Sequence, residues 1–179
     1  MPKKTDEENS EKKWTFRQNP NIDFLLMTFD EGPVPTKQDQ WKSVEMIEEL
    51  EDGKQQIVNK FYVKNPGGPA IREFKQLIAE RANATINGAM ILKPNTVEVI
   101  ISISITENRF KSVDVDNLAK TVLDSLNGIA WEDDSQVVTL LSTKHVHPMK
   151  INGLFVGITK LTENRKGAIG NIGLFKEVK

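Results

Sequence analysis

The clearest periodic segment of the chain is TVEVIISISIT at positions 96–106, where Val or Ile occupies every second position. Alternation with a period of two is typical of a β-strand that buries one face. A shorter apolar run, DFLLMTFD at 23–30, predicts a buried strand that ends at the proline-containing turn EGPVPTK. Two further strands are expected in QVVTLLSTKHV and LFVGITKL, joined by HPMKING as a hairpin.

Three other segments show helical spacing. Residues 41–52 (WKSVEMIEELED) carry apolar side chains three apart and end before Gly53, which predicts a short amphipathic helix. A second helix is expected from Pro69, a residue suited to a first turn, to about Asn83. A third is expected at 116–126, ended by an Asn-Gly pair. The order of elements predicts an α+β domain with a single mixed β-sheet of about four strands, packed with two or three helices.

The two ends of the chain differ from its middle. Residues 1–13 hold four lysines, four acids and almost nothing apolar, so we expect a disordered N-terminal tail over 1–20. The predicted domain spans 21–162, and 163–179 form a C-terminal tail. The absence of cysteine excludes disulfides, thiolate zinc sites and cysteine nucleophiles. No apolar run approaches the roughly 20 residues that span a bilayer, so we expect no membrane partner and a cytoplasmic location.

The net charge of −1 does not itself indicate binding to nucleic acid, but the charge is unevenly distributed. Residues 41–52 carry five acids and one lysine, whereas 53–93 carry seven basic residues and two acids. A basic run of this kind is either a solvated face or a surface that binds phosphate.

The segment VDVDNLAK at 113–120 gathers charges at the start of a predicted helix. One interpretation is structural: Asp116 caps the helix, and Lys120 pairs with Asp116 or Asp124 at i,i+4 spacing. That interpretation leaves Asp114 without a role.

A second acidic group, in WEDDSQ at 131–136, precedes the next predicted strand. If that strand is an antiparallel neighbour, its acids can meet Asp114 and Asp116 at one edge of the sheet. Converging carboxylates repel one another unless a cation neutralises them, and oxygen ligands suit Mg2+ or Mn2+. Such an ion polarises a phosphoryl oxygen and activates water, while Lys120 can offset charge on the phosphate. The residues therefore indicate metal-assisted phosphodiester or nucleotide chemistry.

The segment DVDNLAKTVLDSLNGIAWEDDSQVV closely resembles the signature of the RusA-type crossover-junction endodeoxyribonucleases, the Holliday-junction resolvases common in prophages. The resemblance extends over roughly 23–162 and includes the first strand with its proline-rich turn. It implies a homodimer that binds branched DNA, cuts two strands of a four-way junction symmetrically and uses Mg2+ or Mn2+, in DNA recombination and repair.

The resemblance also implies roles for individual residues. The family's catalytic residues, of which the three aspartates bind the metal, correspond to Asp114, Asp116, Asp134 and Lys120. Asn117 and Asp133 are expected to lie next to these ligands and to orient them without binding the metal directly.

DNA contacts are expected from the residues that precede Asp114. Arg109 and Lys111 are expected to contact phosphates. Phe110 either stacks on bases at the crossover or packs at the edge of the sheet. The segment NIGLF at 171–175 loosely resembles the short apolar peptide with which bacterial replication proteins bind the sliding clamp.

Two other functions fit parts of the pattern. One is a module that recognises branched DNA without cutting it, which the complete set of acids and lysine disfavours. The other is a D-x-D nucleotide-sugar transferase, which needs a larger nucleotide-binding domain than this chain has room for.

Overall fold

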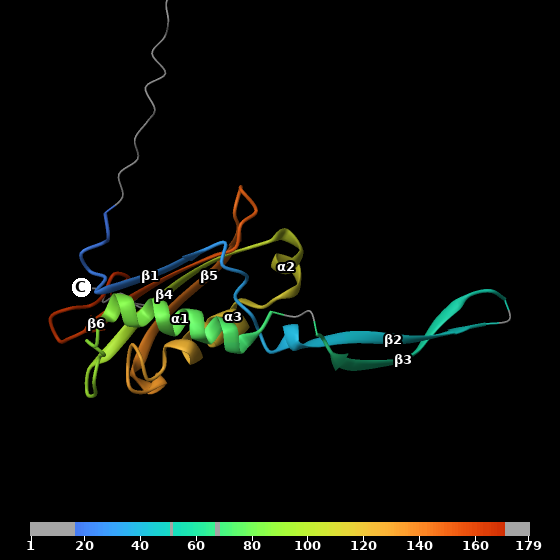
Figure 1. Cartoon of the computed structure of the whole chain (residues 1–179), viewed down its shortest axis with the longest axis horizontal. Coiled ribbons are helices and arrows are strands. Elements are labelled where there is room, and N and C mark those ends of the chain that lie inside the picture. Colours follow the sequence, from blue (N-terminus) through green and yellow to red (C-terminus); the bar gives the residue numbers. More distant parts are fainter. Residues whose placement is uncertain (1–16, 51, 67–68, 171–179) are drawn as a thin grey trace, which may run out of the picture.

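One mixed sheet of four strands forms the centre of the domain (Figure 1). The computed structural model describes residues 17–50, 52–66 and 69–170. The sheet has the order β1-β6-β4-β5, with β6 antiparallel to both of its neighbours and β5 parallel to β4. Its strands are β1 (Phe24–Phe29), β4 (Thr96–Ile105), β5 (Val137–Val146) and β6 (Gly153–Leu161). The predicted α+β class and the strand at 96–106 are confirmed.

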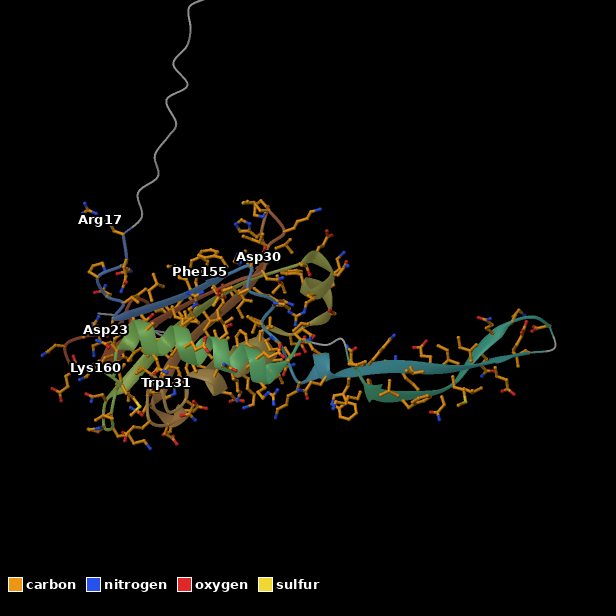
Figure 2. The ribbon with its side chains drawn as sticks, in the orientation of Figure 1. Arg17, Asp23, Asp30, Trp131, Phe155 and Lys160 are labelled. Carbon is orange, nitrogen blue, oxygen red and sulfur yellow. The ribbon has the colours of Figure 1, made fainter. Side chains whose placement is uncertain are left out.

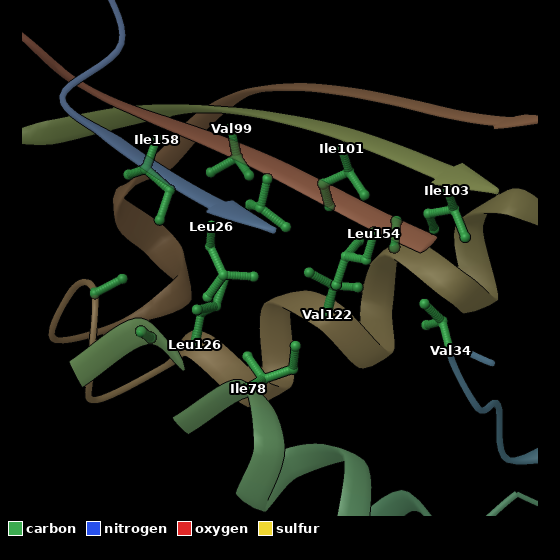
Figure 3. Close-up of a cluster of buried hydrophobic side chains, with 14 of the residues drawn as sticks. Leu26, Val34, Ile78, Val99, Ile101, Ile103, Val122, Leu126, Leu154 and Ile158 are labelled. Atoms are coloured by element: carbon green, nitrogen blue, oxygen red, sulfur yellow. The ribbon is translucent and has the colours of Figure 1, made fainter. Parts of the chain in front are cut away.

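Two helices cover one face of this sheet, and the core lies between them and the strands (Figure 3). They are α1 (Ile71–Ile86) and α3 (Val115–Leu126), and the short α2 (Glu107–Ser112) precedes α3. The alternate side chains of β4 that face the helices are all 0% exposed, as are Leu118 and Val122 of α3. Burying an aliphatic side chain of this size contributes about 1.5–3 kcal/mol, so this layer holds α3 firmly on the sheet.

The connection from β4 to β5 contains α2 and α3, and it makes the two strands parallel. Parallel neighbours need a crossover of about a dozen residues or more, and a helix usually supplies it. The start of β5 therefore lies beside the start of β4, with Val137 opposite Val97.

This topology corrects two expectations. Our prediction of an antiparallel neighbour after residues 131–136 is wrong, because β5 runs parallel to β4. The predicted hairpin of the last two strands is also wrong, because β4 lies between β5 and β6 in the sheet. The loop HPMKING therefore passes over the end of β4 instead of closing a hairpin.

A second, two-stranded sheet projects from the domain as a long arm (Figure 1). It consists of β2 (Trp41–Glu49) and β3 (Gln55–Lys64), preceded by the short 3-10 turn η1 (Gln38–Gln40). Our prediction of a helix at 41–52 is wrong. The Asp52-Gly53 turn, with Gly53 at φ 77°, reverses the chain so that β3 can satisfy the backbone groups of β2.

The described residues after β6 contain no strand of the main sheet, and Glu98 of β4 holds them in place. Its carboxylate is 1% exposed and accepts hydrogen bonds from the backbone N–H groups of Ala168 (2.6 Å) and Ile169 (3.1 Å). The clamp-like peptide at 171–175 and most of the predicted N-terminal tail lie outside the described residues. Within the described ranges, every helix is too short or too polar to cross a bilayer.

Candidate active site

Asp114 and Asp116 lie at the N-terminus of α3, at the end of the domain from which the arm projects (Figure 1). Asp114 is the N-cap residue, so the predicted cap at Asp116 is wrong by two positions, and Asp116 lies in the first turn. Asp114 makes no side-chain cap hydrogen bond. Within the described part of the chain, neither carboxylate has a hydrogen-bond or ion-pair partner, and both are exposed. Both are therefore available to an external ligand.

Three lysines line a small hollow along α3. Lys120 is 65% exposed and pairs with Asp124 at 3.5 Å, as one of the two structural alternatives predicted. Lys75 reaches the same turn, where its Nζ donates to the carbonyl of Asp124 at 3.4 Å. The hollow has a volume of about 90 Å³, and its charged lining comprises Lys37, Lys75, Lys120 and Asp124. Asn117 and Thr121 are its uncharged polar residues. No pattern in the sequence predicts that Lys37 joins this cluster, because Lys37 lies in an irregular segment.

Asp134 lies in η2 (Asp134–Gln136), directly before β5. The indole Nε1 of Trp131, a side chain that is 0% exposed, donates to its Oδ1 at 3.1 Å. Figure 2 places Trp131 on the side of the domain away from the arm. A buried indole therefore fixes the orientation of an exposed carboxylate.

The residues around Asp134 form a rigid turn. The carboxylate of Asp133 accepts from the backbone N–H of Ser135 at 2.8 Å. Hydrogen bonds from Ser135 and the nearby charge of Lys93 lower the pKa of Asp133 below its ordinary value. Gln136, 3% exposed, accepts from two backbone N–H groups of this turn and donates to the carbonyls of Ile91 and Asn95. Gln136 was not identified from the sequence, although glutamine three residues after an N-cap aspartate is a capping-box signal.

Within one chain, the two acidic groups do not converge. The helix α3 has twelve residues and is about 18 Å long at 1.5 Å per residue, with Asp114 and Asp116 at its start and Asp134 in the turn that follows its end. Along β5, Lys144 donates to the carbonyl of Val113, next to Asp114, whereas Asp134 precedes Val137. Seven strand residues cover about 23 Å. The expected convergence required an antiparallel β5, and the described residues contain no group of three potential metal ligands.

The three residues expected to contact DNA have different surroundings. Arg109 is directed inward: its Nη2 donates to Asp39 Oδ2 (2.7 Å) and to the carbonyl of Val34 (3.0 Å). Phe110 is 38% exposed, and the ammonium of Lys144 lies 4.8 Å from its ring centroid. Lys111 is 74% exposed and forms a surface pair with Glu107. Phe110 and Lys111 present surfaces to solvent, and Arg109 does not.

An α+β domain with free carboxylates at the start of a helix and lysines along the same helix has features found in enzymes that act on phosphate esters. The family model described as Endodeoxyribonuclease RusA matches residues 32–159, which include both acidic groups and the arm. The chain belongs to the RusA endodeoxyribonuclease family, whose members act on branched DNA. This membership disfavours a sugar transferase. No curated protein matches the chain.

Proposed function

We propose that this chain is a homodimeric, Mg2+- or Mn2+-dependent endonuclease that cuts four-way DNA junctions during recombination and repair, in the cytoplasm. Each active site would combine Asp114, Asp116 and Lys120 of one protomer with Asp134 of the partner subunit. One observation supports this proposal most directly. Within one chain the two acidic groups lie at opposite ends of α3, and the edge strand β5 beside them could pair with a second copy of the chain.

The edge strand β5 offers a way to join the groups. Among the described strands it pairs only with β4, and Val138, Leu140 and Leu141 on it are 57%, 45% and 44% exposed. An unpaired edge with exposed apolar side chains is a template for a second strand. In an antiparallel pairing centred on Leu140, Asp134 would lie opposite Val146 of the partner subunit.

That arrangement completes two sites at once. Lys144, two residues before Val146, holds the carbonyl that precedes Asp114. Asp134 would therefore approach the Asp114 end of the partner subunit, and twofold symmetry would repeat the contact. Two equivalent sites are what symmetric cutting of a junction requires.

The side chains fit a hard divalent cation. Carboxylate oxygens are the ligands that Mg2+ and Mn2+ prefer, and those of Asp114 and Asp116 have no partner among the described residues. When bound, such an ion polarises the phosphate and lowers the pKa of a water molecule. Lys120, with Lys37 and Lys75 beside it, would bind the scissile phosphate and offset its charge.

Other residues would support this site. Asn117, which lines the same hollow, would orient the ligands on α3. Asp133 would hold the turn that contains Asp134 in place. Lys111 would contact the DNA backbone, and Phe110 would lie against bases near the crossover. Arg109 would act indirectly, by fixing the segment around Asp39.

The first test compares a synthetic four-way junction with a linear duplex of the same sequence, each with Mg2+ and with EDTA. We expect paired, symmetric cuts in the junction with Mg2+ only. Asp116→Asn should retain junction binding and lower the cutting rate by at least about 1,000-fold, because a neutral amide replaces a negatively charged ligand of the metal ion. Binding without product under any divalent cation would instead identify a non-cleaving junction-binding module.

A mixing experiment tests the shared site. Asp116→Asn and Asp134→Asn should each be inactive alone. In a mixed dimer, one site carries both substitutions and the other carries neither, so mixing should restore nicking of one strand. Mixed dimers that stay inactive would place each site within one protomer. Full activity of Asp134→Asn alone would remove Asp134 from the site.

A further inference from the structure

Two exposed aromatic side chains lie together at the base of the arm. Trp41 on β2 and Tyr62 on β3 are 56% and 66% exposed. Trp41 is paired with Lys64 and Tyr62 with Ser43, so the two aromatic residues occupy adjacent positions on one face of the ribbon. Together with Gln38 they line an open hollow of about 520 Å³. Such a hollow has the size and lining to accept a flat apolar group.

The charges near this aromatic pair are mostly positive. On the same face of the ribbon, Lys64 lies opposite Trp41, and Lys60 pairs with Glu45 at 3.2 Å. The distal half of the arm has the opposite sign: over residues 47–58, Lys54 is outnumbered by Glu48, Glu49, Glu51 and Asp52. Because phosphates repel an acidic tip, only the base of the arm suits a nucleic acid.

The base of the arm is continuous with the candidate active site. Gln38, which lines the aromatic hollow, follows Lys37, which lines the hollow of Lys120. The ribbon is fixed there, because the side chain of Asn65 donates to the carbonyl of Asp39 at 3.1 Å. Asp39 in turn pairs with Arg109, five residues before Asp114, at 2.7 Å.

We propose that Trp41 and Tyr62 form a platform on which bases at the branch point stack. Every base has a π-face, so aromatic side chains flanked by lysines bind unpaired or unstacked bases without reading sequence. A continuous duplex keeps its bases stacked and offers none, whereas a junction exposes base faces where the strands exchange. The platform thus adds selectivity for branched DNA to the proposed nuclease function, on which it rests.

Binding measurements in the Asp116→Asn background, with Ca2+ and no Mg2+, test the platform without cleavage. The probes are a four-way junction with 2-aminopurine at the crossover and a linear duplex of the same sequence. Trp41→Ala and Tyr62→Ala should each weaken junction binding by about fivefold to about 150-fold and leave duplex binding nearly unchanged. Trp41→Phe and Tyr62→Phe should restore most of the affinity and the 2-aminopurine signal.

Ile57→Ala is the matched control, since Ile57 is equally exposed (55%) but lies on the acidic half of the arm. It should not change junction binding. Unchanged junction affinity in both alanine variants would overturn the proposal, as would an equal loss in Ile57→Ala. Sedimentation of the same variants identifies another occupant: dissociation into monomers would assign the aromatic face to a second copy of the chain and refute stacking.

The two proposals fail in different ways. If the wild-type protein cuts no junction, the proposed function is lost whatever the arm does. If it cuts junctions normally and both alanine variants bind and cut like wild type, only the platform is lost.

Discussion

The β4 strand and the β3 strand both have ten residues, but their surroundings are opposite. Five alternate side chains of β4 are 0% exposed, whereas every residue of β3 is exposed. Figure 2 shows the side chains of the arm projecting from both sides of the ribbon into solvent. The same element type is thus stabilised by burial in the domain and by cross-strand pairing alone in the arm.

The difference shows which interactions stabilise the folded structure of each region. An isolated two-stranded hairpin is marginally stable at best in water, whereas a sheet covered by helices gains the full hydrophobic contribution of its inner face. The arm therefore depends on the pairing of its two strands and on its attachment at the base.

Matched substitutions in the two regions should give the largest contrast. Ile101→Ala removes a fully buried side chain of β4 and should lower the free energy of unfolding by about 2–5 kcal/mol. Ile57→Ala, at 55% exposure on the arm, should change it by no more than about 0.5 kcal/mol. Urea unfolding followed by far-UV circular dichroism measures both. Similar losses would mean that the arm is part of the cooperative core.

The same contrast explains which elements the sequence predicts. One face of β4 is buried, so its apolar residues alternate, and the alternation identifies the strand. The arm buries neither face, so its apolar residues follow no period that reports its geometry. The spacing of Val44, Ile47 and Leu50 then matched a helix by chance. The Asp-Gly turn between two strand-prone segments was the better signal.

For the candidate site, the sequence motif supplies the candidate residues, but their arrangement comes only from the structure. The motif drew attention to Asp114, Asp116 and Lys120, which the structure places at the N-cap, in the first turn and one turn further along α3. Whether Asp134 can join them depends on the direction of β5, which no local pattern encodes. The intervening helix did favour a parallel strand. Lys37 and Lys75 join Lys120 only through tertiary packing.

The ion pair between Arg109 and Asp39 links the two regions, and its removal should have a moderate effect. Their side chains are 17% and 14% exposed, and Asp39 also accepts from the backbone N–H of Thr36 at 2.6 Å. Arg109→Ala leaves a largely buried carboxylate without its cation and should lower the free energy of unfolding by about 1–3 kcal/mol. A double-mutant cycle with Asp39→Ala should give a coupling of at least about 0.5 kcal/mol.

Lys111→Ala is the control for this pair, because Lys111 forms only a surface pair with Glu107 and should change stability by at most about 0.5 kcal/mol. Hydrogen exchange of the arm amides gives the second measurement. Arg109→Ala should accelerate exchange in β2 and β3 more than in β4. A cycle with no coupling would show that the arm is held to the domain by other contacts.

The smallest expected effect comes from one exposed carboxylate in each region. Hydrogen bonds from Ser135 lower the pKa of Asp133 in the domain, and those from Lys54 lower the pKa of Asp52 at the arm turn. A carboxylate with a lowered folded pKa contributes stability above its unfolded pKa, here 3.8, and loses it as the pH falls through the folded value. Asp133→Asn should therefore slightly reduce the fall in the free energy of unfolding of the domain as the pH is lowered.

Asp52→Asn should leave that pH dependence unchanged and only accelerate amide exchange around Gly53, because the arm turn can open while the domain stays folded. Carboxyl-carbon NMR titrations give the two pKa values, and urea unfolding between about pH 3 and pH 5 gives the stabilities. If Asp52→Asn changed the pH dependence as much as Asp133→Asn does, the tip of the arm and the helix-covered sheet would have to unfold together. Pairing between the two strands of the arm would then be coupled to the core through Asp39 and Arg109, the ion pair that fixes its base.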